Sequence, residues 1–414
     1  MPNNWKTYKL GDIADIQNGY AFKATELVDS GIPVIKIKNI ISPNVLIEDV
    51  SYYNGELTDN LKKYIIEKGD FLISMTGSTV NVMSSAVGKM GRYRLDDKSL
   101  INQRVGKIYL TKPDIASFEY VCQYLNRYEI HYNLALNATG SANQANISPA
   151  QIKDIEILLP TLQEQKSIAS ILSAIDDKIE NNLAINKTLE EMAMALYKHW
   201  FVDFGPFQDG EFIESELGRI PKGWEVKSVY DIANYINGAA FKPSELVDEG
   251  KYVIKISELN GGITKNTGKS TKEVKQEQII NDGSVLFSWS ATLDIFLWDK
   301  GEALLNQHIF NVLPNGSLSI ETLYFLLKNI IAHFKAIAAD RATTMGHIKL
   351  SHLKETFLAI PNEIHKQEFQ NEIEPIFSQI LENLTENQTL TQLRDTLLPK
   401  LISGEVRLKE FQES

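Results

Sequence analysis

Histidine and cysteine are the side chains with which a search for chemistry in this 414-residue chain begins. The seven histidines are scattered, and only His347 and His352 stand at a spacing that zinc ligands use, without a second pair of ligands. We interpret these two as loop or core histidines. Cys122 is the single cysteine, so neither a disulfide framework nor a thiolate cluster is expected, and its apolar neighbours on a predicted helix indicate core packing.

Glycine-rich and acidic motifs also give no catalytic set. Gly268-Lys269-Ser270 follows Gly262 by one residue too many for a phosphate-binding loop, so we predict a turn there. The sequence has no Gly-x-Gly-x-x-Gly fingerprint, no Asn/Asp-Pro-Pro-aromatic signature of an amino-methyltransferase, and no repeated nuclease-like set of carboxylates and lysine. It therefore predicts a chain without a catalytic centre, metal or cofactor of its own.

Two long helices must position whatever binding residues the chain has. In residues 160–205, apolar residues and asparagines alternate in steps of four and three, which is the a/d seam of a heptad helix. Thr161 and Glu164 fit a capping box at its start, and Gly205-Pro206 ends it. A second seam lies near the C-terminus. The seams are Ile168, Leu172, Ile175, Ile179, Asn182, Asn186, Leu189, Ala193, Leu196 and Trp200, and Phe369, Ile373, Ile376, Ile380, Asn383, Asn387, Leu390, Arg394, Leu397 and Leu401.

Both seams place two asparagines at the same two consecutive steps. A buried Asn costs stability but fixes the register, because it must meet another polar group. If the helices run antiparallel, one register pairs Asn182 with Asn387 and Asn186 with Asn383. This coincidence favours an intramolecular antiparallel pair, and the alternative is two unrelated amphipathic helices with exposed asparagines.

The same register also matches the ends of the helices, Trp200 with Phe369. Two prolines weaken the second helix. Pro375 is expected to kink it or to mark its true start, and Pro399 is expected to disturb its last turn.

A comparison of the sequence with itself shows that the chain consists of two copies of one repeat. Asp12–Gly31 matches Asp231–Gly250 at an offset of 219 residues. Asn102-Gln103 then matches Asn306-Gln307 at an offset of 204, and the helices follow at 201. The shrinking offset means that the second copy loses residues from loops in the middle of its globular part.

Each globular part mixes strands and helices, so the predicted fold class is α+β: two similar mixed α/β domains and an antiparallel coiled coil. Strands are predicted from alternating or continuous apolar runs, and helices from amphipathic runs with Asp114 and Ser319 as caps. The predicted strands are Val34–Lys38, Asp70–Met75, Ile101–Leu110, Val253–Ile256, Ser284–Trp289 and Leu305–Leu313, and the predicted helices are Leu10–Asp15, Ile115–Leu136 and Ile320–Ala338.

The net charge of −11 argues against nonspecific binding of nucleic acid, but the charge is unevenly distributed. Residues 1–155 hold 17 basic and 16 acidic side chains, and residues 224–358 hold 14 and 15, so the excess acid lies on the helices and the connector. A near-neutral domain can still carry a basic face. The first residues lack the apolar core of a signal peptide and no apolar run reaches membrane-spanning length, so we expect a cytoplasmic protein without a membrane partner.

Several motifs together resemble one family, the specificity subunits of type I restriction-modification systems. LPTLQEQKSIASILSAIDDKI (Leu159–Ile179) resembles the central helical region of that family. Successive parts of its target recognition domains are similar to Trp5–Lys23, Gly69–Thr79, Asn102–Ile108, Thr139–Ser148, Ile220–Val226 and Ala342–Pro361, and Leu397–Leu408 resembles the family's C-terminus. The resemblance covers essentially the whole chain. One departure is that Ile360–Gln367, at the start of the second helix, lacks the LxEQ motif found at the start of the first.

The resemblance implies a non-catalytic subunit that recognises DNA. Each target recognition domain would read one half of a split, asymmetric target in double-stranded DNA. The helices would set the spacer and dock two methyltransferase subunits, which restriction subunits then join. S-adenosylmethionine, ATP and Mg²⁺ would belong to those partners, as would adenine-N6 methylation and DNA cleavage. The implied recognition domains are 1–157 and 224–360, the helical regions are 158–205 and 361–414, and the linker is 206–223.

Side-chain chemistry then selects candidates for DNA contact. Asn and Gln can form two hydrogen bonds with adenine, Arg and Lys with guanine, and hydroxyl groups and loop amides suit phosphates. Phe22 and Phe241 recur at matching positions, which fit either a core or a DNA-facing role. The candidates in the first copy are Tyr20, Phe22, Lys23, Lys38, Thr76, Ser78, Thr79, Arg92, Arg104, Ser141, Asn143 and Gln144. Those in the second copy are Phe241, Lys242, Trp289, Ser290, Thr292, His308, Arg341, Thr343, Thr344 and His347.

Two other functions stay open from the sequence. A self-contained methyltransferase with its own recognition domain is disfavoured by the missing motifs, and methyl transfer by the isolated chain would reveal it. A structural adaptor with coiled-coil arms would not bind a split duplex target. Salt-dependent DNA binding separates a reader from such an adaptor, because phosphate contacts release counterions.

Overall fold

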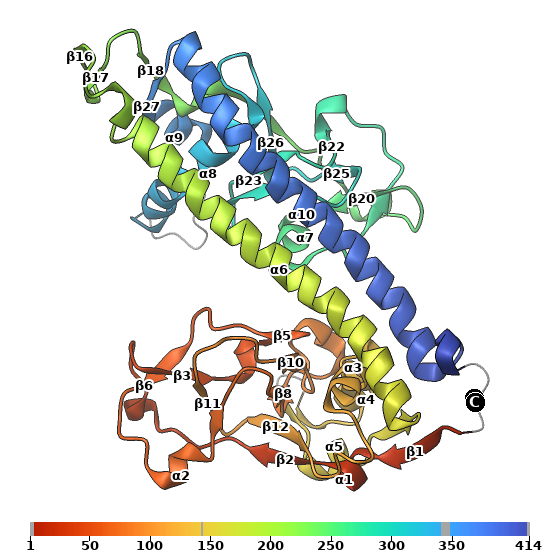
Figure 1. The fold of residues 1–414 in the computed structure, drawn as a ribbon. Helices are drawn as coiled ribbons and strands as arrows, with labels where there is room; N and C mark the ends of the chain where they lie inside the picture. The colour runs from red at the N-terminus through yellow and green to blue at the C-terminus, as the bar shows by residue number, and fades with distance from the viewer. Residues whose placement is uncertain (1–3, 142–143, 341–347, 412–414) are drawn as a thin grey trace. The chain divides into compact units, whose positions relative to one another are not determined.

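A computed structural model describes residues 4–141, 144–340 and 348–411. The chain forms two compact units, residues 1–177 with 392–414 and residues 178–391, named unit 1 and unit 2 below (Figure 1). Each unit combines a globular α/β part with one half of an antiparallel helix pair, so the predicted fold class is confirmed.

The globular part of unit 1 is built on two sheets whose strands come from distant parts of the sequence. One sheet has six strands in the order β2-β12-β8-β10-β5-β4, and the other has four in the order β6-β3-β11-β7. The sheet β13-β14-β9 and the pair β1-β15 complete this part. The strands are β1 Lys6–Lys9, β2 Ala14–Asn18, β3 Ile32–Ile35, β4 Ile40–Ile41, β5 Asn44–Val45, β6 Ser51–Tyr53, β7 Ile65–Ile66, β8 Phe71–Ser74, β9 Thr76–Gly77, β10 Met90–Arg92, β11 Ser99–Ile101, β12 Val105–Leu110, β13 Thr139–Ser141, β14 Gln144–Asn146 and β15 Glu156–Leu159. The α-helices are α1 Leu10–Ile13, α2 Asp59–Lys62, α3 Phe118–Leu125, α4 Tyr128–Leu136 and α5 Pro149–Lys153.

Unit 2 repeats this plan with shorter sheets. Its sheets have the orders β19-β26-β23-β24 and β21-β20-β25-β22, which match β2-β12-β8-β10 and β6-β3-β11-β7 of unit 1. The pairs β18-β27 and β16-β17 complete it. The strands are β16 Phe212–Ser215, β17 Gly218–Pro221, β18 Glu225–Ser228, β19 Ala233–Asn237, β20 Lys251–Ile254, β21 Lys269–Ser270, β22 Ile279–Ile280, β23 Val285–Ser288, β24 Asp294–Leu297, β25 Ala303–Leu305, β26 Ile309–Pro314 and β27 Phe357–Ile360, and the α-helices are α7 Ile256–Gly261, α8 Ile320–Asp340 and α9 Leu350–Glu355.

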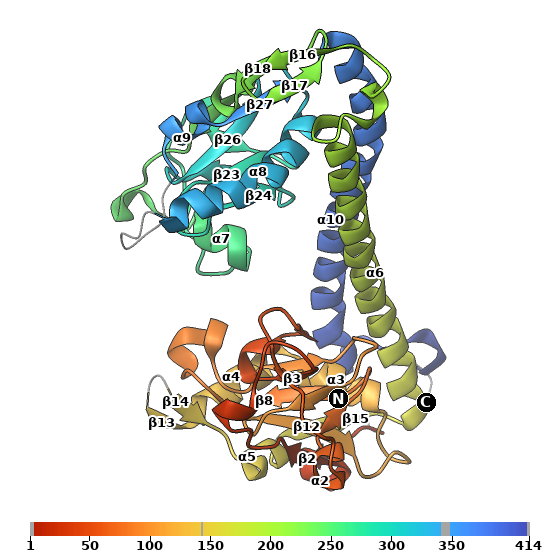
Figure 2. The same cartoon turned by 90° about the vertical axis from the view of Figure 1, so that its left-hand side faces the viewer.

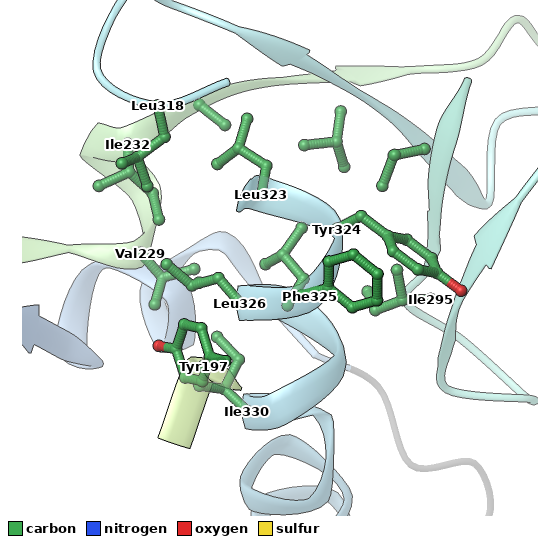
Figure 3. Packing of buried hydrophobic residues seen from close by; sticks show 14 of the residues in the cluster. Tyr197, Val229, Ile232, Ile295, Leu318, Leu323, Tyr324, Phe325, Leu326 and Ile330 are labelled. Carbon is green, nitrogen blue, oxygen red and sulfur yellow. The ribbon is translucent and has the colours of Figure 1, made fainter. Parts of the chain in front are cut away.

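Helix α8 supplies much of the apolar core of unit 2, where it lies against the sheet of β23, β24 and β26 (Figure 2). Leu323, Phe325 and Leu326 on this helix are at most 1% exposed. Figure 3 shows Tyr197 of the first long helix beside Ile330 of α8. Full burial of one such apolar side chain contributes about 1.5–3 kcal/mol, so this contact fixes the globular part on its half of the helix pair.

Cys122 on α3 packs in the core of unit 1, as predicted, and its side chain is 4% exposed. Burial in apolar surroundings raises the pKa of the thiol to about 12, because the thiolate would lose its hydration. The thiol is therefore protonated and unreactive in the folded chain.

The two long helices run antiparallel with their seams facing each other. They are α6, Leu162–Phe201, and α10, Glu363–Ser403. In unit 2 the amide of Asn182 donates to Asn387 Oδ1 at 2.9 Å, and the amide of Asn383 donates to Asn186 Oδ1 at 2.7 Å. All four side chains are at most 9% exposed. The two polar steps thus meet inside an apolar seam, in the register that the sequence predicts.

Pro375 does not mark the start of α10, which is one of the two expectations for this proline. The helix begins at Glu363 because Phe369 and Ile373, both 0% exposed, already pack in the core of unit 2 before the proline is reached. Pro375 and Pro399 both lie on exposed positions of the continuous helix. On that face, a carbonyl that loses its helical N–H partner can bind water instead.

A buried ion pair holds the start of α6 in unit 1. Glu164 N donates to Thr161 Oγ1 at 3.3 Å, which is one half of the predicted capping box. The carboxylate of Glu164 does not complete the box, and instead accepts two hydrogen bonds from Arg407, both 2.9 Å, and one from Trp5 Nε1 at 3.3 Å. Its side chain is 1% exposed. The carboxylate binds the guanidinium in preference to the backbone, because the guanidinium offers two charged donors and the backbone offers one neutral N–H.

The start of α10 in unit 2 uses aromatic rings at the same place. Trp224 Nε1 donates to His365 Nδ1 at 3.0 Å, and the ring of Phe207 lies 4.4 Å from that of His365. Trp224 and His365 stand at the repeat positions of the Trp–Glu pair of unit 1. The ring of Phe207 packs on the histidine, whereas in unit 1 the guanidinium of Arg407 binds the glutamate. We call these two sites the unit 1 junction and the unit 2 junction.

Two predicted strands are each divided by a turn. Ile101–Leu110 becomes β11 and β12, with Val105 N donating to Asn102 O at 2.8 Å to close the turn. Leu305–Leu313 is divided in the same way into β25 and β26. The polar residues at the break look like the outward face of one strand, so alternation alone does not reveal the turn.

The predicted helix Ile115–Leu136 also forms two elements, α3 and α4. Asp114 does not cap it, because the first of them begins after Ser117, whose N–H is bound by Gln165 Oε1 at 2.8 Å. Ser319 does cap α8, since its Oγ accepts a hydrogen bond from Thr322 N at 3.4 Å.

Two segments expected to be irregular contain strands. The linker 206–223 includes the hairpin β16-β17, in which Phe212 pairs with Pro221 and Ser215 with Gly218. Lys269–Ser270 is strand β21 rather than a turn, because it pairs with β20. Short polar strands of this kind depend on their partner strand and leave little periodic signal.

Candidate nucleic-acid interface

The turn between β11 and β12 is the centre of the candidate interface in unit 1. Val105 N closes this turn on Asn102 O. The loop after β2 lies on it, because Tyr20 N donates to Ile101 O and Gly19 N donates to Val105 O, both at 2.9 Å. Four backbone groups thus fix the turn to a neighbouring loop.

Unit 2 contains the same turn, between β25 and β26, with the same bonds. Ile309 N closes it on Asn306 O at 3.2 Å. Ala239 N donates to Leu305 O at 2.8 Å, and Gly238 N donates to Ile309 O at 3.1 Å. The backbone framework is therefore common to both units.

Glycine is required where the loop meets the turn. A Cβ on Gly19 would lie 2.2 Å from Asn102 O, and a Cβ on Gly238 would lie 2.3 Å from Asn306 O. Real Cβ atoms do not approach a carbonyl oxygen so closely. The repeated Asn-Gly pair of the sequence is thus explained by contact with the turn.

Three motifs converge beside the turn of unit 1. Met75 N donates to Arg104 O at 2.9 Å, and Ile147 N donates to Met75 O at 3.1 Å. Thr76 Oγ1 donates to Asn146 Oδ1 at 2.8 Å, across the pairing of β9 with β14. Figure 2 shows β14 with its partner β13, the hairpin that carries Ser141 and Gln144.

Trp289 occupies the equivalent place in unit 2. Its backbone carbonyl accepts a hydrogen bond from Ile348 N at 3.0 Å, and its indole Nε1 donates to Asn237 Oδ1 at 3.1 Å. Its ring lies 5.4 Å from the ring of His308, which follows the Asn-Gln pair in this copy. Among the described residues of unit 2, two rings therefore lie together beside this turn.

Residues 2–191 and 221–395 each match the domain family described as "Type I restriction modification DNA specificity domain". The chain belongs to this family. The two matched segments contain both turns and most of both long helices, so the duplicated framework lies inside the matched domains.

Named relatives agree with this assignment. The chain is 27% identical over 440 residues to the type I restriction enzyme MjaIX specificity subunit of Methanocaldococcus jannaschii. The match covers 99% of the chain and 95% of the relative. The chain is 25% identical over 476 residues to the HindI specificity subunit of Haemophilus influenzae, covering 98% and 100%. The crystal structure of a type I restriction-modification S subunit from M. genitalium shares the fold, with a TM-score of 0.54, 18% identity and coverage of 97% of both chains.

The aromatic candidates for DNA contact are half-buried. Phe22 lies 4.9 Å from Tyr20 and 5.4 Å from Tyr53, measured between ring centroids. Lys272 instead lies over the ring of Phe241, with its Nζ 5.4 Å from the ring centroid. Each ring therefore packs on its own unit and still presents an edge to solvent.

The polar candidates differ in exposure. Lys23 and Lys242 are exposed and begin equivalent short helical turns, where their backbone N–H groups bind Glu26 and Glu245 at 2.6 and 2.7 Å. Ser290 is buried. The remaining hydroxyls are partly or fully exposed and bonded within the unit, Ser78 to Ser85 at 2.8 Å and Thr292 to Asn260 at 3.0 Å, while Thr79 begins the adjoining 3-10 helix.

Two basic candidates are already paired within unit 1. Lys38 binds Asp49, and this hydrogen bond lowers the pKa of the Asp49 carboxyl. Arg92 makes two hydrogen bonds to Glu119, at 2.7 and 2.5 Å, in a cavity of about 410 Å³ that Lys166 of α6 also lines. Five further candidates lie outside the described residues: Asn143, Arg341, Thr343, Thr344 and His347.

Asn146 and Asn237 belong to the candidate interface, although side-chain chemistry alone did not select them. Each supports a candidate, Thr76 or Trp289, through its side-chain oxygen. Both lie inside repeated or family-like motifs of the sequence, so the signal was present. Support of a neighbour, however, depends on strand pairing that the sequence does not display.

The described residues contain no group of three or more His, Cys, Asp and Glu side chains able to hold a metal ion. His352 is buried, and its Nδ1 accepts a hydrogen bond from Lys349 N at 3.3 Å. None of the helices in the described part of the chain is long and apolar enough to cross a membrane.

Proposed function

We propose that this chain is the DNA-recognition subunit of a type I restriction-modification complex and that it catalyses neither methylation nor cleavage itself. The observation that carries this proposal is the shared turn framework. Two domains of one family hold the same backbone bonds and display different side chains from them, Arg104 in one and His308 in the other. Two readers of different half-sites need this combination of constant frame and variable chemistry.

In this proposal each recognition domain, 1–157 and 224–360, reads one half of a bipartite, asymmetric duplex target. The residues around the two turns read base edges in the major groove, and the neighbouring hydroxyl groups and lysines bind phosphates. The excess acid lies on the helices and connector, which leaves the two domains near neutral and free to carry a basic face.

The helix pair is proposed to set the spacer and to dock two methyltransferase subunits, with restriction subunits joining that assembly. The buried asparagine pairs support the spacer role, since they hold one register between the helices. Ile171, Leu183 and Met192 on α6 are 37%, 45% and 54% exposed, which supports a docking face on this helix. S-adenosylmethionine, ATP and Mg²⁺ belong to the partners in this proposal, as does adenine-N6 methylation.

The experiment that tests this function is methylation mapping. The chain is co-expressed with its cognate methyltransferase subunit, and N6-methyladenine is mapped across the host genome by single-molecule sequencing. We expect a bipartite motif that disappears when this chain is omitted, and no methyl transfer by the purified chain alone. Absence of a motif, with both proteins folded and associated, would overturn the reader function.

A heptad insertion tests the spacer. Seven residues are inserted beside Ile175 in α6 and seven beside Arg394 in α10, which the register places opposite each other and where Arg394 binds Asp176 at 3.1 Å. One heptad adds about 10 Å of helix, or about three base pairs of duplex. The mapped motif is expected to keep both half-sites and to lengthen its spacer. An unchanged spacer would exclude the helices as its ruler.

A further inference from the structure

We propose that Arg104 determines specificity in unit 1 by reading a guanine in its half-site, and that His308 holds the equivalent reading position in unit 2. This inference rests on the proposed function and deepens it, because it assigns one base of the target to one side chain.

Arg104 is the arginine of unit 1 that the described structure leaves without a partner. Its side chain is exposed, whereas the other arginines of this unit are engaged. Their partners are Glu119 for Arg92, Asp177 for Arg94, Tyr124 for Arg127, Asp176 for Arg394 and Glu164 for Arg407. A guanidinium with five unoccupied donors is therefore available at this turn and nowhere else among the described arginines of the unit.

The backbone that carries Arg104 is fixed on both sides. Its carbonyl accepts a hydrogen bond from Met75 N at 2.9 Å, and the next residue, Val105, is bonded to Asn102 and Gly19. Val105 is 0% exposed and packs in a core cluster. A side chain on such a rigid turn loses little conformational freedom on binding beyond its own rotamers, which favours specific contacts.

Guanine is the base that fits this side chain. The fork of an arginine donates to guanine O6 and N7 together in the major groove, a contact that discriminates against other bases. A histidine at the same position offers one ring N–H to a base edge, and His308 lies against Trp289 with its Nε2 3.4 Å from Gln307 Nε2. The shared turn thus carries a two-pronged reader in unit 1 and a one-pronged reader in unit 2.

The test is methylation mapping of full-length variants with the cognate methyltransferase subunit. Arg104→Gln is expected to lose the preference for guanine at one position of one half-site, by about ten- to hundredfold in relative methylation, and to leave the other half-site unchanged. His308→Arg, an independent variant, is expected to add a guanine preference at one position of the other half-site. The matched control is Lys112→Gln, which changes an exposed lysine two residues after the end of β12 and is expected to keep the wild-type motif.

Each outcome decides between the two claims. A wild-type motif that Arg104→Gln leaves unchanged, or that it weakens evenly at every site as a phosphate contact would, overturns the specificity role while the proposed function stands. A wild-type chain that produces no motif overturns the proposed function itself. Thermal unfolding and co-purification with the methyltransferase subunit establish that each variant is folded and assembled before its motif is compared.

Discussion

The unit 1 junction and the unit 2 junction occupy equivalent places in the repeat, but different types of interaction hold them together. At the unit 1 junction, a carboxylate that is 1% exposed binds Arg407 and the indole of Trp5. At the unit 2 junction, the indole of Trp224 donates to a histidine that also lies against a phenylalanine ring. The tryptophan is common to both junctions, whereas its partners differ.

Both copies therefore keep a contact between three segments at this place, although the residue types differ. A buried carboxylate needs a cation, and an aromatic imidazole needs a flat apolar neighbour, so a change at one member demands a change at the other. The two junctions should therefore fail in different ways when a partner is removed.

The two units have separate reporters that make this comparison measurable. Of the five tryptophans, Trp5 belongs to unit 1 and the other four belong to unit 2, so fluorescence chiefly follows unit 2. Cys122 is the single thiol and lies in unit 1. Because its pKa is raised to about 12 and it is buried, alkylation of Cys122 requires unfolding around it.

Arg407→Ala is expected to have the largest effect. It leaves the Glu164 carboxylate buried without a cation, and breaking a buried ion pair by removal of one partner typically costs about 3–5 kcal/mol. Alkylation of Cys122 in the native chain should become at least about a hundredfold faster. The fluorescence transition in urea should move little; an equal shift of both reporters would contradict the separate roles of the junctions.

Phe207→Ala is the matching break in unit 2. The ring is partly exposed and packs on His365, Trp200 and Trp224, so its loss should cost about 1–3 kcal/mol. The urea midpoint followed by fluorescence is expected to fall, and Cys122 alkylation should stay at the wild-type rate. Faster alkylation would show that the unit 2 junction also stabilises unit 1.

The asparagine seam gives a third test, because its paired groups are neutral amides, although Asn182 also binds Lys178 and Glu386. Asn182→Leu alone leaves Asn387 Oδ1 buried without its donor and should destabilise unit 2 by about 1–3 kcal/mol. Asn182→Leu with Asn387→Leu should regain that loss and raise the melting temperature above wild type, at the cost of a less defined register. A double variant as unstable as the single one would show that the pair does not act as a unit.

The smallest loss of stability is expected when the residue types of the unit 2 junction are introduced into unit 1. Glu164→His combined with Arg407→Phe copies the unit 2 junction into unit 1. We expect this double variant to lie within about 1 kcal/mol of wild type by the Cys122 reporter, far closer than Arg407→Ala, since residues in contact compensate each other non-additively. A loss as large as that of the alanine variant would mean that the surrounding core, not the trio itself, selects the ion pair.

Much of the architecture was predictable because it repeats or has a period. The offset between Asp12–Gly31 and Asp231–Gly250 revealed two similar domains, and the heptad steps with paired asparagines gave the helix register. The convergence of Thr76, Arg104 and the β13-β14 hairpin beside one turn was not predictable, since hydrogen bonds across 29 to 72 residues leave no periodic mark.

Charged residues were the hardest to assign from sequence. Arg92 and Arg104 look alike in composition, yet Glu119 engages the first and the second stays exposed. Glu164 fitted a local capping box and was diverted by Arg407, which is 243 residues away in sequence. Long side chains reach partners that only the tertiary fold brings near, so residue type indicates what a charge can bind but not what it does bind.

The unit 1 junction joins segments that are far apart in the sequence. Trp5 and Arg407 stand 402 positions apart and bind the same carboxylate of Glu164. At the unit 2 junction, Phe207 and Trp224 lie in contact and are only 17 positions apart. Forming the unit 1 junction therefore costs more loop-closure entropy than forming the unit 2 junction.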